Sequence, residues 1–268
     1  MQDFRQKVVV ITGGGGGIGA AMARAFAARG ARIVLADLDE AAMARVAGSL
    51  AGTETLCVRT DVGDLASVRA LADAAERRFG GADVVCNNAG VAIFGEMAAA
   101  THADWEFTMR VNFWGVVHGV EVFVPRLLAR GSGHVVNTAS MAGLVGMQWL
   151  GVYAASKFAV VGLTESLHRE LVPRGIGVTV VCPMVVETDI NRNSVRMRPA
   201  DLRNPGEDPV LPPAGAIVGG VIPPDEVARR VLRAIERNDL YVLTHPEQRK
   251  YLKRRADKLD AMFAPGVW

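Results

Sequence analysis

The hydrophobic positions of this chain form two kinds of segment that alternate along it. Short runs rich in β-branched residues, such as Val8-Val9-Val10-Ile11, are typical of strands buried on both faces of a parallel sheet. Between them lie longer amphipathic or alanine-rich stretches typical of helices. The strands are predicted at 7–12, 31–36, 54–59, 83–87, 133–138, 176–182 and 240–243. The helices are predicted at 18–29, 40–50, 64–79, 101–129, 152–172, 224–237 and 247–263.

This alternation predicts an α/β fold in one domain that covers residues 1–268. Strands joined through helices require right-handed crossovers, which give a doubly wound parallel sheet of about seven strands with helices on both faces. Half of the residues are hydrophobic, which is enough to bury such a sheet. A ligand site is expected at the carboxyl ends of the strands, where the strand order reverses.

The regular pattern stops between Glu187 and Pro223, in a stretch that carries five prolines and four arginines. A long irregular segment inside a compact domain is usually functional or disordered. We predict a substrate lid at about 187–223 and call this range the lid segment.

The last predicted helix, at about 247–263, has a basic face and an apolar stripe. The stripe consists of Leu252, Ala256, Leu259 and Phe263. Acidic residues dilute the basic face, so packing on the body or on a neighbouring subunit is favoured over binding to nucleic acid or membrane.

A glycine-rich turn from Gly13 to Gly17 follows the first predicted strand and leads into a helix. Backbone N–H groups and a helix N-terminus therefore point to one place, which suits a phosphate group. The next strand ends at Asp37, about 20 positions beyond the turn, where dinucleotide-binding folds hydrogen-bond the adenosine ribose. A carboxylate repels a 2′-phosphate, and no Arg or Lys lies in the turn or beside Asp37 in the sequence. NAD is therefore predicted in preference to NADP.

Tyr153 and Lys157 carry the candidate chemistry, because residues four apart share one face of a helix. A nearby ammonium favours the phenolate, so we expect Lys157 to lower the pKa of Tyr153 and make it useful for proton transfer near neutral pH. Ser140 follows an apolar strand and can hold the reacting oxygen. A partly buried ring beside a solvated lysine has the same spacing, so this interpretation depends on the rest of the chain.

Six signatures in a fixed order give the chain a resemblance to a known family. They are Thr12-Gly13-x-x-x-Gly17-Ile18-Gly19, Asn87-Asn88-Ala89-Gly90, Asn112, Ser140, Tyr153 and Lys157. From Lys7 to Thr188 the chain resembles the classical short-chain dehydrogenase/reductases. This resemblance implies a Rossmann-type domain and hydride transfer between a nicotinamide and a carbonyl or alcohol carbon. The stretch Asn238 to Glu247 also resembles bacterial dehydrogenases that act on benzylic alcohols of aryl ethers.

The resemblance assigns roles to the matching residues. Tyr153 would be the acid/base, and Ser140 would orient the substrate oxygen. Lys157 would bind the nicotinamide ribose, and Asn112 would support a water that links Lys157 to solvent. The implied cofactor-binding residues are Gly13, Gly17, Ile18, Gly19, Asp37, Asp61, Val62, Asn88, Ala89, Gly90, Tyr153, Lys157, Val186 and Thr188.

Met184 departs from the family pattern, which has Pro-Gly where this chain has Pro183-Met184. We expect Met184 to narrow or line the substrate pocket; filling the core is the other interpretation. Apolar residues near the family's substrate positions predict a bulky apolar or aromatic substrate, although any one of them can equally be a core or dimer contact. The predicted pocket residues are Phe94, Met141, Met147, Trp149 and Met184.

Composition narrows the other classes of function. The formal net charge is only +2 and no apolar run reaches the length of a membrane span, so neither nucleic acid nor membrane is expected as a partner. Three scattered cysteines indicate reduced thiols, and five histidines without ligand spacing predict no metal site. The short segment before the first strand leaves no room for a signal peptide, which favours a cytoplasmic enzyme.

Two other functions and one assembly state follow as expectations. A catalytically silent cofactor-binding regulator is opposed by the intact catalytic set. An epimerase or dehydratase usually carries a larger C-terminal region than the roughly 80 residues after Thr188. An apolar stripe on the helix 101–129 predicts a homodimer or homotetramer. It consists of Phe113, Val117, Val120 and Val124.

Overall fold

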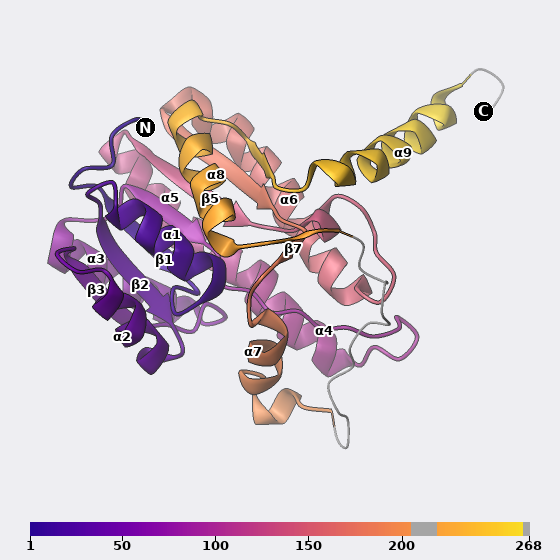
Figure 1. Cartoon of the computed structure of the whole chain (residues 1–268), viewed down its shortest axis with the longest axis horizontal. Coiled ribbons are helices and arrows are strands. Elements are labelled where there is room, and N and C mark those ends of the chain that lie inside the picture. Colours follow the sequence, from indigo (N-terminus) through magenta and orange to yellow (C-terminus); the bar gives the residue numbers. More distant parts are fainter. Residues whose placement is uncertain (205–218, 265–268) are drawn as a thin grey trace.

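A seven-stranded parallel sheet forms the centre of the structure, a computed structural model that describes residues 1–204 and 219–264 (Figure 1). Its strand order is β3-β2-β1-β4-β5-β6-β9, so the order reverses between β1 and β4. All six pairings of neighbouring strands are parallel. The strands are β1 (Val8–Thr12), β2 (Arg32–Asp37), β3 (Thr55–Arg59), β4 (Val84–Asn87), β5 (Gly133–Thr138), β6 (Ile176–Cys182) and β9 (Tyr241–Leu243).

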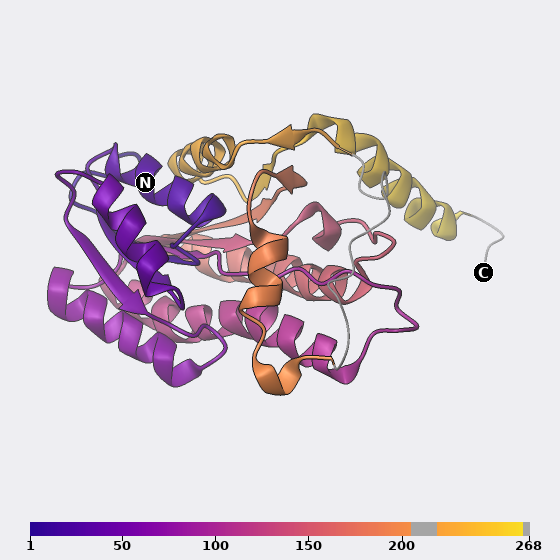
Figure 2. The ribbon, with the colours of Figure 1, turned by 60° about the horizontal axis from the view of Figure 1, so that its bottom comes forward.

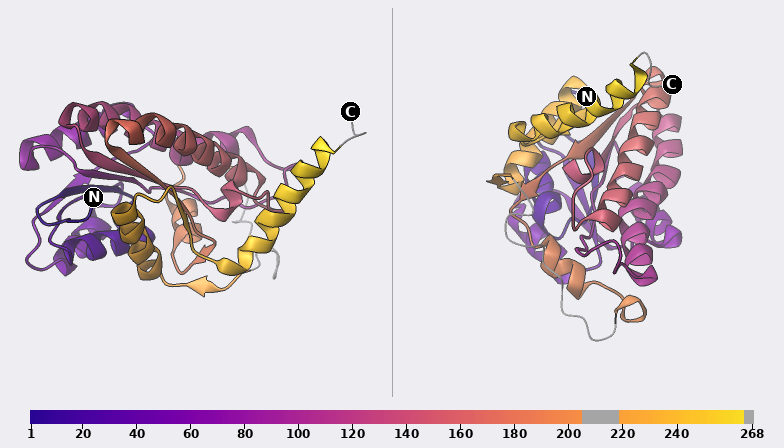
Figure 3. Two further views of the ribbon diagram at one scale, coloured as in Figure 1. Left: turned by 90° about the horizontal axis from the view of Figure 1, so that it is seen from above. Right: turned by 90° about the vertical axis from the view of Figure 1, so that its right-hand side faces the viewer.

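Helices cover both faces of this sheet, as Figure 3 shows from two sides. Met22, Phe26 and Val231 belong to the core on one face, which is covered by α1 (Gly17–Ala27), α2 (Glu40–Ser49) and α8 (Pro224–Arg237). Leu71, Phe123 and Leu171 belong to the core on the other face, under α3 (Leu65–Phe79), α5 (Gly115–Arg130) and α6 (Gly151–Leu171). Within the described ranges no helix is both long and apolar enough to cross a membrane.

The predicted helix 101–129 has an interruption that the apolar pattern does not reveal. It consists of α4 (His102–Met109), a π-helical turn over Arg110–Trp114, and α5. A π-turn has a wider ring of backbone hydrogen bonds, is rare, and is found mostly at functional sites. Its buried member is Asn112.

The lid segment is more regular than predicted in its described parts. A second, two-stranded sheet joins its two ends: β7 (Val185–Val186) lies directly before the segment and β8 (Val221–Ile222) lies near its end. Between them lie α7 (Ile190–Arg196) and a 3₁₀ turn at Ala200–Leu202. Residues 205–218 of the predicted lid lie outside the described residues. Figure 2 shows α7 in front of the sheet, between the N-terminal half and α4.

The C-terminal helix α9 (Arg249–Asp260) contacts the body near its start, where Leu252 is half-buried and the Arg255 guanidinium lies 5.5 Å from the centre of the Phe158 ring of α6. It contains no buried residue and extends away from the domain (Figure 3). Leu259 and Phe263 of the predicted stripe are 51% and 77% exposed. Packing on a neighbouring subunit remains a prediction.

Candidate active site

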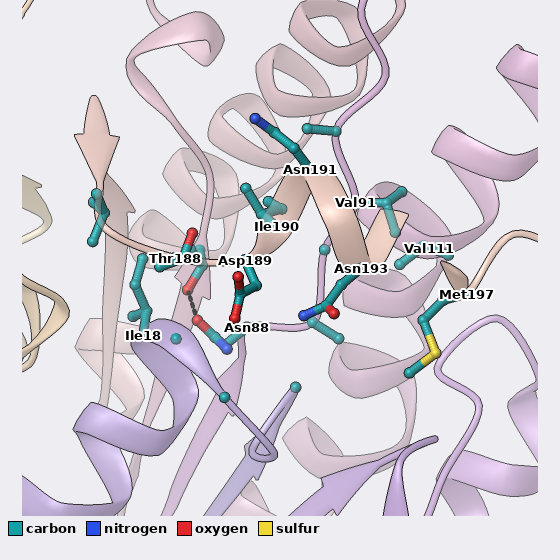
Figure 4. A pocket seen from close by; sticks show the side chains of 18 of the residues that line it. Ile18, Asn88, Val91, Val111, Thr188, Asp189, Ile190, Asn191, Asn193 and Met197 are labelled. Carbon is teal, nitrogen blue, oxygen red and sulfur yellow. Dashed lines mark hydrogen bonds between the residues drawn. The ribbon is translucent and has the colours of Figure 1, made fainter. Parts of the chain in front are cut away.

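A cavity of about 530 Å³ lies at the carboxyl ends of the strands, where the strand order reverses. The glycine turn, the ends of β2 and β4, the N-terminal part of α6 and the lid helix α7 form its walls (Figure 4). The structure thus brings distant predicted residues together. Those that line the cavity are Gly13, Gly17, Ile18, Asp37, Asp61, Val62, Asn88, Ala89, Gly90, Phe94, Ser140, Met147, Tyr153, Lys157, Met184, Val186 and Thr188.

The glycine turn has the shape needed to hold a pyrophosphate. Gly13 has φ +65°, a left-handed conformation that favours glycine. A Cβ on Gly19 would lie 2.1 Å from the Gly13 carbonyl oxygen, so Gly19 lets the helix pack against the turn and does not itself line the cavity. The first turn of α1 has no side-chain cap and no acidic residue, which leaves its N-terminus suited to an anion.

Asp37 and Asp61 are held at the end of the cavity that lies beside the carboxyl ends of β2 and β3. The Asp37 carboxylate accepts hydrogen bonds from the Gly15 N–H at 2.9 Å and the Asp39 N–H at 3.0 Å. Asp61 accepts from the Gly63 N–H at 2.8 Å and pairs with Arg110 at 2.9 Å. Each carboxylate oxygen has a second lone pair, so Asp37 can still accept from ribose hydroxyls.

Thr12 fixes the end of β4 against β1. Its hydroxyl accepts the N–H groups of Asn88 at 2.9 Å and Ala89 at 3.1 Å, while the Asn88 amide donates to the Thr12 carbonyl at 3.0 Å. The Asn88 amide oxygen accepts from Thr138 of β5 at 3.2 Å. These bonds place Asn88, Ala89 and Gly90 along one wall of the cavity.

Lys157 and Tyr153 lie side by side at the bottom of the cavity, on one face of α6. The Lys157 ammonium is 5.6 Å from the centre of the Tyr153 ring and donates to the Thr138 carbonyl at 2.9 Å. Ser140 precedes a short 3₁₀ turn at Met141–Gly143, and its hydroxyl accepts the Ala142 N–H at 3.1 Å. An interaction between the Ser140 hydroxyl and the Tyr153 phenol links the two elements.

The pKa of Tyr153 does not move in the predicted direction. Burial raises the pKa of the phenol, and the Ser140 hydroxyl opposes that rise only in part. Burial also lowers the pKa of Lys157 to about 8, because its side chain is almost fully enclosed. The expectation of a lowered pKa for Tyr153 is therefore wrong: loss of solvent is the largest influence on the phenol, and it raises the pKa.

Asn112 is fully buried behind the cavity and is not part of its lining. Its amide oxygen accepts the Val91 N–H at 2.8 Å, and its amide nitrogen donates to the Val91 carbonyl at 2.9 Å and to Ser156 at 3.0 Å. A Cβ on Gly90 would lie 3.3 Å from the Asn112 oxygen and 3.4 Å from the Lys157 nitrogen. Asn112 and Lys157 therefore face the same glycine.

Two of the predicted pocket residues do not line the cavity. Met141 is 1% exposed and belongs to the core, and Trp149 does not line the cavity either. Trp149 has φ +68°, and its carbonyl accepts the Gly95 N–H at 3.0 Å, so it shapes the neighbouring loop. Further apolar residues line the cavity without having been predicted as pocket residues; they are Val91, Phe107, Val111, Ile190 and Met197.

Met184 lines the cavity, and His245 holds its backbone. The Met184 N–H donates to Nδ1 of His245 at 3.4 Å, so Nε2 carries the proton that is donated to the Gly220 carbonyl at 2.8 Å. One buried imidazole thus binds the start of the lid segment and its end. The sequence alone does not predict this contact, because His245 is not spaced from other residues in a way that would indicate a site. In the described part of the chain no cluster of three His, Cys, Asp or Glu side chains is arranged to hold a metal.

Comparison with known proteins agrees with this geometry. The family model of the short chain dehydrogenases matches residues 7–199. A short-chain dehydrogenase/reductase from Burkholderia phymatum, solved in complex with NAD, is 40% identical, with a TM-score of 0.91 over 99% of this chain and 98% of that one. A CLA biosynthesis dehydrogenase/reductase from Lactiplantibacillus plantarum is 33% identical over 100% of this chain and 98% of its own length. The C alpha-dehydrogenase of Sphingobium sp. strain SYK-6 is 32% identical over 99% and 89%.

A parallel sheet with a glycine turn at its switch point, and a Ser–Tyr–Lys set beside it, define a dinucleotide-dependent oxidoreductase of alcohols and ketones. The chain belongs to the short-chain dehydrogenase family. It also shows similarity to a C alpha-dehydrogenase.

Proposed function

We propose that this protein is an NAD-preferring dehydrogenase that interconverts a secondary alcohol and a ketone on a bulky apolar or aromatic substrate. The observation that carries the proposal is the convergence of Ser140, Tyr153 and Lys157 at the bottom of one cavity, beside the glycine turn. The whole chain is covered by relatives that are dehydrogenases or reductases by name.

The four catalytic residues divide the work of proton transfer. The nicotinamide, when bound, supplies or accepts the hydride. In ketone reduction the Tyr153 phenol donates its proton to the substrate oxygen, and in alcohol oxidation the phenolate accepts it. The Ser140 hydroxyl orients that oxygen. Lys157 binds the nicotinamide ribose and favours the phenolate while it is charged, below its pKa of about 8.

Asn112 holds the Val91 backbone and faces Gly90 together with Lys157, so we assign it the support of the path by which Lys157 exchanges its proton. Other residues of the cavity bind the dinucleotide. Gly13, Gly17 and Ile18 surround the pyrophosphate, and Asp61 and Val62 flank the adenine. Asn88, Ala89 and Gly90 form the wall beside the cofactor, and Val186 and Thr188 contact the carboxamide.

Asp37 supports the preference for NAD. Its carboxylate is fixed by two backbone N–H groups at the adenosine end, where it attracts the ribose hydroxyls and repels a 2′-phosphate. A relative with 40% identity is known in complex with NAD.

The apolar end of the cavity supports a large apolar substrate. Phe94, Phe107, Met147 and Met184 line it, and its polar groups converge on Tyr153. The C alpha-dehydrogenase relative points to aryl carbinols within this class.

The test is a panel of secondary alcohols, from aliphatic to aryl, assayed with NAD and with NADP at the absorbance of reduced nicotinamide. We expect the highest kcat/KM with NAD and an aryl or bulky apolar alcohol. Asp37→Ala should weaken NAD and relax the exclusion of NADP. A higher efficiency of the wild type with NADP would refute the preference, and activity on none of the alcohols or ketones would refute the proposed reaction.

We also propose a homodimer or tetramer in the cytoplasm. An apolar area on the π-turn and the start of α5 supports assembly. It consists of the half-buried Phe113, Val117 and Val120 and the 50% exposed Trp114. The free, buried thiols of Cys86 and Cys182 suit a reducing compartment.

A further inference from the structure

The lid helix α7 forms part of the cavity wall. Ile190, Asn191 and Asn193 of this helix and Met197, the residue after it, line the cavity, and Figure 4 shows them from close by. The position of α7 therefore helps to set the width of the cavity.

On the substrate side α7 is tied firmly to the body. The buried Ser194 hydroxyl accepts the Ala92 N–H at 2.8 Å. Two residues after the helix, Arg198 pairs with Asp104 of α4 at 2.8 Å, and only 14% and 9% of these two side chains are exposed. Leu202 packs in one cluster with Phe107. This side of the lid is therefore a buried anchor.

On the adenosine side a single, more exposed ion pair connects α7 to the body. Arg196, the last residue of the helix, binds the second carboxylate oxygen of Asp39 at 2.9 Å, while the first accepts the Ala42 N–H and caps α2. Asp39 is 18% exposed and Arg196 is 55% exposed. Both residues line the cavity, and Asp39 follows two residues after Asp37.

Arg196 and Lys157 are the cations among the described residues of the cavity lining. Lys157 lies at the nicotinamide end beside Tyr153, so Arg196 is the cation nearest the proposed ribose site. Its charge is already matched by Asp39, and no polar group of the catalytic set contacts it. The geometry therefore suits a reversible closure better than a role in the reaction.

We propose that the Arg196–Asp39 ion pair is a clasp that closes the lid over the adenosine half of the bound dinucleotide and slows its release. The inference rests on the proposed dinucleotide occupancy of the cavity. Exposed ion pairs contribute about 0.2–1 kcal/mol, which corresponds to about 1.4- to 5-fold in a rate or an equilibrium constant. Asp39 is mostly buried, so we expect an effect of about 3- to 5-fold, which decreases at high salt.

The test is the rate of NADH release, followed by nucleotide fluorescence in stopped flow. Arg196→Gln and Asp39→Asn should each release NADH about 3- to 5-fold faster; asparagine keeps the cap of α2. The double variant should release it no faster than the single ones, because both remove the same pair. Arg196→Lys should restore most of the wild-type rate. Arg192→Gln is the matched control: Arg192 lies on the same helix, pairs with Asp189 and does not line the cavity.

Four outcomes would overturn the clasp. Release from Arg196→Gln at the wild-type rate, or effects of Arg196→Gln and Asp39→Asn that add, would show that the pair does not hold the lid. A loss of NADP binding with unchanged NADH release would instead make Arg196 a ligand of the 2′-phosphate. A wild type that binds neither dinucleotide would overturn the proposed function together with the clasp, whereas the other outcomes leave that function intact.

Discussion

Tyr153 lies in surroundings that keep its proton in place. Burial raises the pKa of the phenol, and burial also lowers the pKa of the neighbouring Lys157 to about 8. The phenol is therefore suited to act as an acid that donates its proton to a ketone oxygen. Oxidation of an alcohol needs the phenolate, so we expect the rate of alcohol oxidation to increase as the pH rises.

Replacing Tyr153 by Phe keeps the packing of the ring and removes the proton. We expect kcat to fall by about 10²- to 10⁴-fold, the usual contribution of general acid–base catalysis, while NAD binding is kept. Steady-state kinetics and a binding titration measure the two quantities, with Tyr251→Phe on the exposed α9 as the control. A Tyr153→Phe variant that keeps most of the activity would rule out the assignment.

Lys157 makes the stability of the protein depend on pH in a defined window. Its pKa falls from 10.5 in the unfolded chain to about 8 in the folded one, so between these values the unfolded state binds more protons and stability rises with pH. Below pH 8 the buried ammonium lowers the free energy of unfolding by the full amount, about 3 kcal/mol.

Lys157→Met lacks this dependence. We expect the free energy of unfolding of the wild type, minus that of the variant, to rise by about 2 kcal/mol between about pH 7 and about pH 9.5. Urea unfolding at the two pH values measures it, and other titrating groups cancel in the difference. A difference that stays constant with pH would show that the ammonium of Lys157 is not buried at that cost.

At the scale of elements, the seven sheet strands and the helices on both faces were predictable because each carries its own hydrophobic period. The predicted strands 133–138 and 176–182 match β5 and β6 to the residue. The π-turn at Arg110–Trp114 was not predictable, because its cause is tertiary: Asn112 must reach both Val91 and Ser156. The regular parts of the lid segment also escaped prediction, since β7 and β8 are two residues each and pair across a long separation in sequence.

His245 shows a contact between elements that no local pattern encodes. It binds the Gly220 carbonyl and the Met184 N–H, so replacing it by Ala leaves two backbone groups near the lid without these partners. We expect the free energy of unfolding to fall by about 1–3 kcal/mol, as measured by urea denaturation. His102→Ala, at an exposed position of α4, should change it by less than about 0.5 kcal/mol. Equal stability of the two variants would contradict this role of His245.

At the scale of the whole molecule, the proposed catalytic and cofactor residues form an ordered series of motifs in the sequence, and the fold brings most of that series, although not Gly19 and Asn112, to the lining of one cavity. The substrate end was predicted less well. Met141 and Trp149 were predicted because they lie near the family's substrate positions, but which apolar side chains reach a cavity depends on the direction of each in three dimensions. Phe107 and Met197 reach it from α4 and the lid segment.

The assembly state is testable directly. We expect light scattering at micromolar protein to give at least twice the chain mass of 28.5 kDa. Trp114→Glu, in the π-turn between α4 and α5, should lower the measured mass, because it places a charge in the proposed interface. Phe263→Glu, beyond α9, tests separately whether the projecting helix contributes to assembly. A wild-type mass near 28.5 kDa would contradict both interfaces.

The π-turn has a consequence for how this chain can change over generations. A π-turn holds one residue more than an α-helical turn, so deleting one residue between Met109 and Gly115 would convert it into α-helix and leave the faces of α4 and α5 aligned. What would be lost is the wide turn that places Asn112 against Val91 and Ser156. Substitutions at the exposed Trp114 leave these bonds in place. Among descendants of this chain, deletions should therefore be absent from this stretch and collect in the connecting loops.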